Sequence, residues 1–203
     1  IKSQRAIAFP ESVGILLWNA GYLEATFAIQ QALHDYARKT SDRVRLAFAL
    51  GNQAVILKVR GDLSEAMRHH EEEERLCREL GDWAGLGRSL GNQARILFQR
   101  GDLEGAMRLD KESERLYRDV GDMVGLSTSL GNQAGNLMDH GDLEGAMRLY
   151  KESERLCRDV GDMVALARSL GNQARILSKR GDLEGAMRLH KESERLCREL
   201  GNS

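Results

Sequence analysis

The stretch that decides the fold runs from Gly91 to Met107 and reads GNQARILFQRGDLEGAM. Its first four letters recur at intervals of 40 residues, at Gly51, Gly131 and Gly171. A Gly-Asp pair marks the chain every 20 residues, from Gly61-Asp62 to Gly181-Asp182. Self-similarity at a period of 20–50 residues is typical of stacked repeat arrays, so this period organises every other inference from the sequence.

Each Gly-Asp pair predicts the end of one helix and the start of the next. Glycine readily takes the left-handed conformation that terminates a helix. The carboxylate of the following aspartate accepts hydrogen bonds from the first N–H groups of the next helix. About 18 residues, or roughly 27 Å of helix, separate successive pairs. Apolar residues within 103–120 recur at helical spacing, which predicts antiparallel helices joined by very short turns.

The predicted fold is all-α: an α-solenoid of about five antiparallel helix pairs with a 40-residue repeat. The first pair, residues 1–40, is a divergent one that begins near Pro10 and carries the turn-like sequence at Gly21. The predicted repeats that follow are 41–80, 81–120, 121–160 and 161–203. The last helix, Leu183–Leu200, has no successor to cover its outer flank, although solenoids normally end in a polar cap. Together with the missing initiator Met, this favours a chain cut from a longer protein, or an end that packs against another molecule.

A glycine in the middle of each first helix needs a cause, because it costs about 1 kcal/mol relative to alanine. Gly91 and its copies lie three residues before an alanine, Ala94 in this repeat. We expect these two residues to form a small patch where a neighbouring helix approaches closely.

Composition limits the classes of partner. The chain has 30 basic and 31 acidic residues and a formal charge of −1, so no global field attracts nucleic acid or an anionic membrane. The longest apolar run, Val13–Trp18, is too short to span a bilayer. The three cysteines, Cys77, Cys157 and Cys197, occupy one repeat position, where neighbours should lie ~8–10 Å apart, beyond disulfide range. We expect reduced core thiols and a cytoplasmic location.

The residues of this repeat resemble those of the tetratricopeptide repeat family. The match is carried by a small residue before the turn (Ala94), the turn glycine (Gly101) and the second-helix alanine (Ala106). The longer period and the Asn of Gly-Asn-Gln-Ala are similar to repeats of the kinesin light chain and nephrocystin type. The period of 40 exceeds the family's 34, and Leu90 stands where the family has Trp. The resemblance implies a right-handed superhelix whose first helices line a concave, ligand-binding groove.

The copies differ mainly in the first helix. Between the copies that start at Gly81 and Gly121, 11 of 40 positions differ, and nine of them lie in the first helix. We therefore expect a groove that binds a protein or peptide, and the excess of arginine favours an acidic one. The predicted partner-binding residues are Asn52, Asn92, Asn132, Asn172, Arg88, Arg95, Phe98, Gln99, Arg168 and Arg175.

Two questions about this groove stay open in the sequence. The repeated asparagines either hold a peptide backbone, as the resemblance to kinesin light chains implies, or satisfy a neighbouring helix. The third of the Gly-Asn-Gln-Ala copies departs most from the others, with Gly135, Asn136, Asp139 and His140. This departure is either a specificity pocket or a tolerated lesion.

Nothing in the sequence predicts catalysis. No phosphate loop, Cys-x-x-Cys pair, zinc motif or nucleophile elbow occurs, so we expect no enzyme activity, cofactor or metal. His69-His70, followed by a run of glutamates, is expected on a solvated helix face, because no other copy keeps the pair.

The leading hypothesis is a protein-interaction scaffold, and three alternatives stand beside it. The chain could be the regulatory or sensor arm of a larger signalling or effector protein, or it could self-associate through its C-terminal helix. RNA reading by helical repeats is disfavoured by the balanced charge and the few aromatic residues of the groove.

Overall fold

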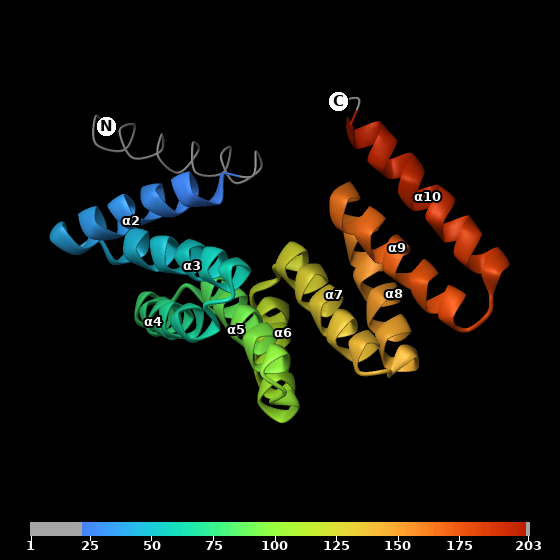
Figure 1. Ribbon diagram of the computed structural model, residues 1–203, viewed down its shortest axis with the longest axis horizontal. Helices are drawn as coiled ribbons and strands as arrows, with labels where there is room; N and C mark the ends of the chain where they lie inside the picture. Colours follow the sequence, from blue (N-terminus) through green and yellow to red (C-terminus); the bar gives the residue numbers. More distant parts are fainter. Residues whose placement is uncertain (1–21, 202–203) are drawn as a thin grey trace. The chain divides into compact units, whose positions relative to one another are not determined.

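The computed structural model describes residues 22–201, which form nine α-helices and no strand (Figure 1). The helix predicted near Pro10 lies outside this range. The all-α helical repeat array is thereby confirmed. The helices are α2 (Leu23–Lys39), α3 (Arg43–Arg60), α4 (Leu63–Leu80), α5 (Trp83–Gln99), α6 (Leu103–Val120), α7 (Met123–Asp139), α8 (Leu143–Val160), α9 (Met163–Lys179) and α10 (Leu183–Gly201).

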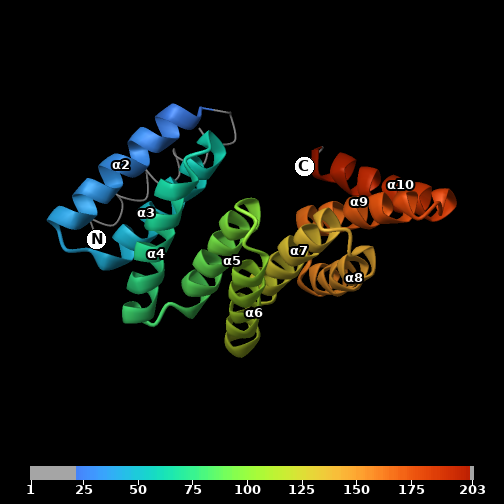
Figure 2. The ribbon, with the colours of Figure 1, turned by 60° about the horizontal axis from the view of Figure 1, so that its bottom comes forward.

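The chain divides into two compact units, residues 1–96 and 97–203, with the boundary inside α5. In the first unit, α3 packs against both α2 and α4. In the second unit, each helix from α7 to α10 packs on the helix that precedes it in the chain, beginning with α7 on α6, as Figures 1 and 2 show. The first helices α7 and α9 touch each other as well, which is the contact that stacking of helix pairs produces.

The Gly-Asp turns have the predicted geometry. All seven turn glycines from Gly61 to Gly181 have φ between 70° and 90°, and Ser41 takes the same left-handed conformation at φ 55°. The aspartate that follows accepts a hydrogen bond of 2.8–3.0 Å from the backbone N–H three residues later. Asp62, which precedes α4, is the exception, since its side chain makes no such bond.

The mid-helix glycines allow the close approach that their recurrence predicts. A Cβ at Gly131 or Gly171 would lie 3.8 or 3.6 Å from the serine hydroxyl of the next second helix, Ser153 or Ser193. These serines donate hydrogen bonds of 2.9 and 2.8 Å to backbone carbonyls of their own first helix. At Gly51 the partner is the Glu73 carboxylate, which occupies the space that a Cβ would need.

The predicted core thiols are confirmed at two of three positions. Cys77 and Cys157 are buried, and burial, helped by the nearby charges of Glu73 and Asp82, raises the pKa of Cys77 to about 12. Cys197 is exposed, so the prediction of a core thiol was wrong there. It lies on α10, whose outer flank is not covered by any helix of the described residues, and only Gly185, Ala186 and Leu196 of that helix are buried.

Substitutions at one turn test the repeating geometry. Gly181→Ala should cost about 1–2 kcal/mol of unfolding free energy, because an L-residue is strained at φ 84°. Asp182→Ala should cost about 1 kcal/mol through the lost cap. Urea unfolding followed by circular dichroism measures both, with the exposed Lys179→Ala as the control. A Gly181→Ala variant as stable as the control would show that this turn is not left-handed in solution.

Thiol accessibility should follow burial. In the native chain, Cys197 should react with a disulfide reagent such as DTNB within seconds to minutes, while Cys77 and Cys157 react only on unfolding. The absorbance change should correspond to about one thiol per native chain. A Cys197→Ser variant should lose this fast phase, and its persistence would contradict the burial of the other two.

Candidate functional site

Each first helix carries an exposed stripe at matching positions, which we call its first-helix stripe. Its spacing of 4, 4, 3 and 4 residues keeps the side chains on one helix face. The residues are Val44, Phe48, Asn52, Val55 and Val59 on α3; Ala84, Arg88, Asn92, Arg95 and Gln99 on α5; Val124, Thr128, Asn132, Gly135 and Asp139 on α7; and Val164, Arg168, Asn172, Arg175 and Lys179 on α9. Each of them is exposed or partly exposed.

The predicted partner-binding residues fall on this stripe, with one exception. Asn52, Arg88, Asn92 and Arg95 belong to the first compact unit, and Gln99, Asn132, Arg168, Asn172 and Arg175 belong to the second. Phe98 lies off the stripe, where it lines a pocket of the second unit. Nine of the ten predicted partner-binding residues thus share one face of their helices, and partner binding at all ten stays a prediction.

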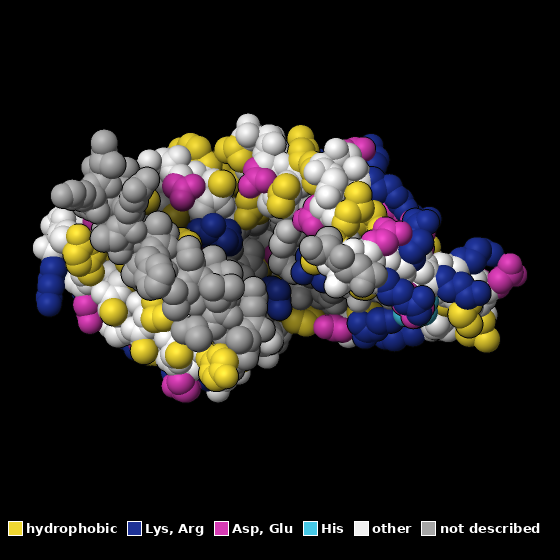
Figure 3. Space-filling model, turned by 90° about the horizontal axis from the view of Figure 1, so that it is seen from above, with side chains coloured by type: hydrophobic (Ala, Val, Ile, Leu, Met, Phe, Trp, Pro, Cys, Tyr) yellow, Lys and Arg dark blue, Asp and Glu magenta, His cyan; other side chains and the backbone are white. Residues whose placement is uncertain are grey.

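The stripe changes chemistry from helix to helix. On α3 it is apolar, with Val44 and Val59 more than half exposed. On α9 it is basic, since Arg168, Arg175 and Lys179 are exposed and the helix contains no acidic residue. In Figure 3, Lys and Arg side chains gather at the right of the view, where α9 and α10 lie.

The four asparagines of the stripe are half-buried, and two of them have defined partners inside the chain. The Asn52 amide donates to Gln30 Oε1 of α2 at 3.3 Å. The Asn172 carbonyl accepts from Arg175 at 3.3 Å on its own helix. A ligand at either position would have to share or replace these hydrogen bonds.

Arg88 is tied to a buried acid. Its guanidinium lies 3.3 Å from Glu73 Oε1, although the arginine side chain is 55% exposed and the glutamate side chain only 1%. His70 Nδ1 lies 2.9 Å from the other carboxylate oxygen and is itself fully buried. The expected solvated face was therefore wrong for His70, because this residue occupies the position that Tyr150 fills with its ring in a later repeat. Arg88 has a structural role, whatever else it binds.

Arg95 lies in a cation-rich place of the first unit. Burial and the charge of Arg95 together lower the pKa of Lys58 on α3 to about 8. Lys58, which is half-buried, and Arg95 are therefore close enough for their positive charges to repel each other. An anionic group bound beside them would reduce this repulsion.

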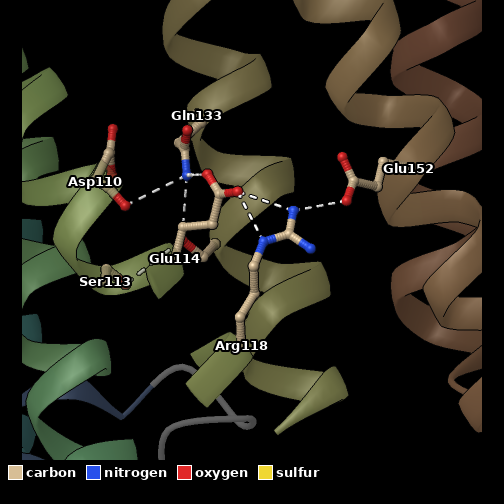
Figure 4. A network of polar contacts seen from close by, with 7 residues as sticks. Asp110, Ser113, Glu114, Arg118, Gln133 and Glu152 are labelled. Atoms are coloured by element: carbon tan, nitrogen blue, oxygen red, sulfur yellow. Dashed lines mark hydrogen bonds and ion pairs between the residues drawn. The ribbon is translucent and has the colours of Figure 1, made fainter. Parts of the chain in front are cut away.

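A repeating polar chain connects the repeats of the second unit. Gln133 of α7 donates to Glu114 of α6, Glu114 pairs with Arg118, and Arg118 pairs with Glu152 of α8 at 2.7 Å (Figure 4). The same links recur in Gln173, Glu154, Arg158 and Glu192. Sequence reasoning missed this chain, although a Glu followed at +4 by Arg and at +19 by Gln, which occurs from Glu74, Glu114 and Glu154, was the available signal.

The divergent third copy lines a pocket, which we call the α6–α7 pocket. Its lining consists of Phe98, Leu103, Ala106, Met107, Asp110, Lys111, Gln133, Asn136, Leu137 and His140. Asn136 donates to the Asp110 carboxylate at 3.3 Å, and the rings of Phe98 and His140 meet edge to face at 6.2 Å. The sequence left open whether the departures in this copy form a specificity pocket or are a tolerated lesion. The cavity lined by Asn136 and His140 favours the pocket.

Within residues 22–201, no three His, Cys, Asp or Glu side chains come together in a way that could hold a metal ion. No helix in this range is long and apolar enough to cross a membrane.

Comparison with known proteins agrees with the repeat geometry. Residues 166–200, which cover most of α9 and α10, match the tetratricopeptide repeat family. The resemblance to tetratricopeptide repeats of the kinesin light chain type is confirmed. No relative among curated proteins matches the sequence.

Solved structures share this tetratricopeptide-type fold at low sequence identity. BtubC (BKLC) from P. vanneervenii is 14% identical over 98% of this chain and 92% of its own, with a TM-score of 0.70. A putative kinesin light chain from Podosopora anserina with nearly identical TPR-like repeats is 13% identical over 98% of both chains, with a TM-score of 0.66. A Rap protein complexed with Competence and Sporulation Factor is 11% identical over 95% of this chain and 54% of its own, with a TM-score of 0.86. At these identities the likeness concerns the fold.

The structural role of Arg88 can be separated from binding. Arg88→Thr, which introduces the residue found at Thr128, should destabilise the chain by about 1–3 kcal/mol because it leaves the buried Glu73 carboxylate undercompensated. Arg168→Thr, at the matching exposed position of α9, should change little. In a Glu73→Ser background, which restores the serine of later repeats, the cost of Arg88→Thr should disappear. Urea unfolding of the four variants measures this cycle, and an undiminished cost in that background would refute the pairing.

Proposed function

We propose that this chain is a non-enzymatic, cytoplasmic protein-interaction scaffold that binds a peptide or protein along its first-helix stripe. One observation carries the proposal. Four of the five stripe positions differ between α5 and α7, and the fifth is the constant asparagine. The second helices of the same two repeats differ at only two positions. The other five first-helix differences lie off the stripe, so the variation belongs to the first helices as a whole and includes most of their exposed stripe positions. Variable exposed positions in otherwise copied units are what selective recognition by repeats requires.

The charge of the stripe favours an acidic partner at its α9 end. Arg168, Arg175 and Lys179 present cationic groups one or two turns apart, and α9 offers no carboxylate to neutralise them. Guanidinium groups form short, bidentate hydrogen bonds with carboxylates, which suits acidic side chains or a chain terminus. The half-buried asparagine between them can donate to and accept from a peptide bond.

Another protein with a similar fold has been solved with a bound factor. The Rap protein that resembles this chain was solved in complex with Competence and Sporulation Factor. We take this as support for ligand binding by the array, while the residues used here follow from the stripe.

Two further candidates each have one supporting observation. A regulatory arm of a larger protein is favoured by the match to only 54% of the Rap protein's length. Self-association through α10 is favoured by the exposure of Leu183 and Met187, which are 69% and 58% accessible. Mass measured against concentration by analytical ultracentrifugation tests the second.

Peptide selection tests the proposed stripe. A phage library of random 12-residue peptides, selected on the wild-type chain, should yield acidic sequences. Their affinity should fall at least about tenfold for Arg168→Glu/Arg175→Glu, because each charge reversal replaces an attractive contact with a repulsive one. The matched control is Arg115→Glu/Arg155→Glu, which makes the same charge change on exposed faces of the second helices α6 and α8. Equal affinity for both variants would place the binding surface elsewhere.

A further inference from the structure

One step between repeats differs from the others in how its interior is filled. The difference is seen in the exposure of the methionine that every second helix from α4 to α10 carries at the same repeat position. Met67 and Met147 are 8% and 7% exposed, whereas Met107 is 52% exposed. That value is close to the 58% of Met187 on α10, which no described helix follows. Met107 is therefore largely uncovered, although α7 packs beside α6.

The cause is the loss of two large side chains. Between α8 and α9, the corresponding space is filled by Tyr150 and Ile176, which are 2% and 0% exposed and pack with Met138 and Met147. The same positions between α6 and α7 hold the shorter residues Asp110 and Asn136. A pocket of about 190 Å³ remains there.

The pocket has apolar walls and a polar end. Phe98, Leu103, Ala106, Met107 and Leu137 form the walls. At the polar end, the Asp110 carboxylate accepts from Asn136 at 3.3 Å.

The polar end is held in place by the repeating polar chain. Gln133 donates to the Asp110 carbonyl at 3.4 Å and to Glu114 at 3.3 Å, and Glu114 is fixed by Arg118 (Figure 4). Interactions that hold the lining before a ligand arrives lower the entropic cost of binding. These bonds hold the Gln133 side chain of the lining, and the Asn136 amide holds the Asp110 carboxylate, before a ligand arrives.

From these features we infer that the α6–α7 pocket binds one neutral aromatic side chain of a protein partner, with tyrosine as the best fit. The inference rests on the proposed function as a protein-binding scaffold. An apolar cavity of ~150 Å³ already accommodates benzene, so the volume suffices for a substituted ring. The chain's own Tyr150 shows that a tyrosine occupies the equivalent space.

The chemistry of the lining selects a neutral ring. The Met107 thioether and the Phe98 ring make favourable contacts with aromatic groups. A phenol hydroxyl can donate to the buried carboxylate of Asp110, whereas a ring carboxylate cannot donate and would be repelled by it. Lys111 also lines the pocket, but its exposed ammonium is screened by solvent and offsets this repulsion only weakly.

The pocket is distinct from the first-helix stripe. None of its lining residues belongs to the stripe, because Gln133, Asn136, Leu137 and His140 lie on the neighbouring face of α7. A partner that used both surfaces would place an acidic segment on the stripe and an aromatic anchor in the pocket.

Methionine methyl NMR with a small probe tests the pocket directly. The chain is labelled with [methyl-¹³C]methionine and titrated with 4-methylphenol, which is the tyrosine side chain. The Met107 signal should shift and saturate, with half-saturation on the order of 1 mM. The exposed Met187 signal should not shift, and the anionic 4-methylbenzoate should bind at least about tenfold more weakly.

The control variant fills the pocket from within. Asp110→Tyr/Asn136→Ile restores the residues found at Tyr150 and Ile176, so it should fold and melt no lower than the wild type. It should abolish the saturable Met107 shift. Equal, unsaturable shifts of Met107 and Met187, or a saturable shift that survives in the filled variant, would overturn the inference.

A second arm tests that the occupant comes from a protein. Tyrosine-containing peptides selected by the wild-type chain should lose affinity for Asp110→Tyr/Asn136→Ile and keep it for Lys151→Ala, which changes an exposed lysine of α8 outside the pocket. If 4-methylphenol saturates Met107 while every selected peptide binds the filled variant normally, the pocket serves a small aromatic molecule and the assignment to a protein partner is wrong. If Arg168→Glu/Arg175→Glu binds peptides as well as the wild type, the stripe proposal is wrong, but neither the Met107 shift nor the effect of the filled variant on peptide affinity changes. The stripe and the pocket are therefore tested independently.

Discussion

The left-handed glycine followed by a capping aspartate is the constraint on which the other features depend. It ends one helix and starts the next within two residues, and it does so every 20 residues from Gly61 to Gly181. Because the turns are short and recur every 20 residues, the described helices are 17 to 19 residues long, and equivalent side chains return to the same level within each unit. A longer or more variable turn would let the repeats drift out of register.

Because equivalent residues of successive repeats lie at the same level, a contact made between two helices can recur between the next two. The chain of Gln133, Glu114, Arg118 and Glu152 works only if each helix presents its polar residue at the level of its neighbour. Exposed ion pairs of this kind contribute little individually. Together with the buried serine hydroxyls, they specify how consecutive helices align, while the apolar clusters supply most of the stabilisation.

The same register makes departures informative. Replacing a tyrosine and an isoleucine with Asp110 and Asn136 in an otherwise copied layer opens a pocket in a defined place. Replacing a serine with Glu73 puts a carboxylate against Gly51, and His70 and Arg88 compensate for it. In both cases the scaffold tolerates the change because its turns and polar links are unchanged. A repeat array can in this way acquire individual sites without losing its architecture.

The sequence by itself determined the helices, their boundaries to within a residue or two, and the helix of each pair in which the repeats vary. These properties are local: a glycine that needs positive φ, a cap three residues from its N–H, and a helical period of apolar residues can all be read along the chain. It also indicated that the third copy was unusual at Asn136 and His140. Only the tertiary structure showed that Phe98 joins these residues in a pocket, that His70 is buried against Glu73, and that Cys197 is exposed. Each of these depends on which side chains the neighbouring helices bring to the same level, and packing rather than any local pattern decides that.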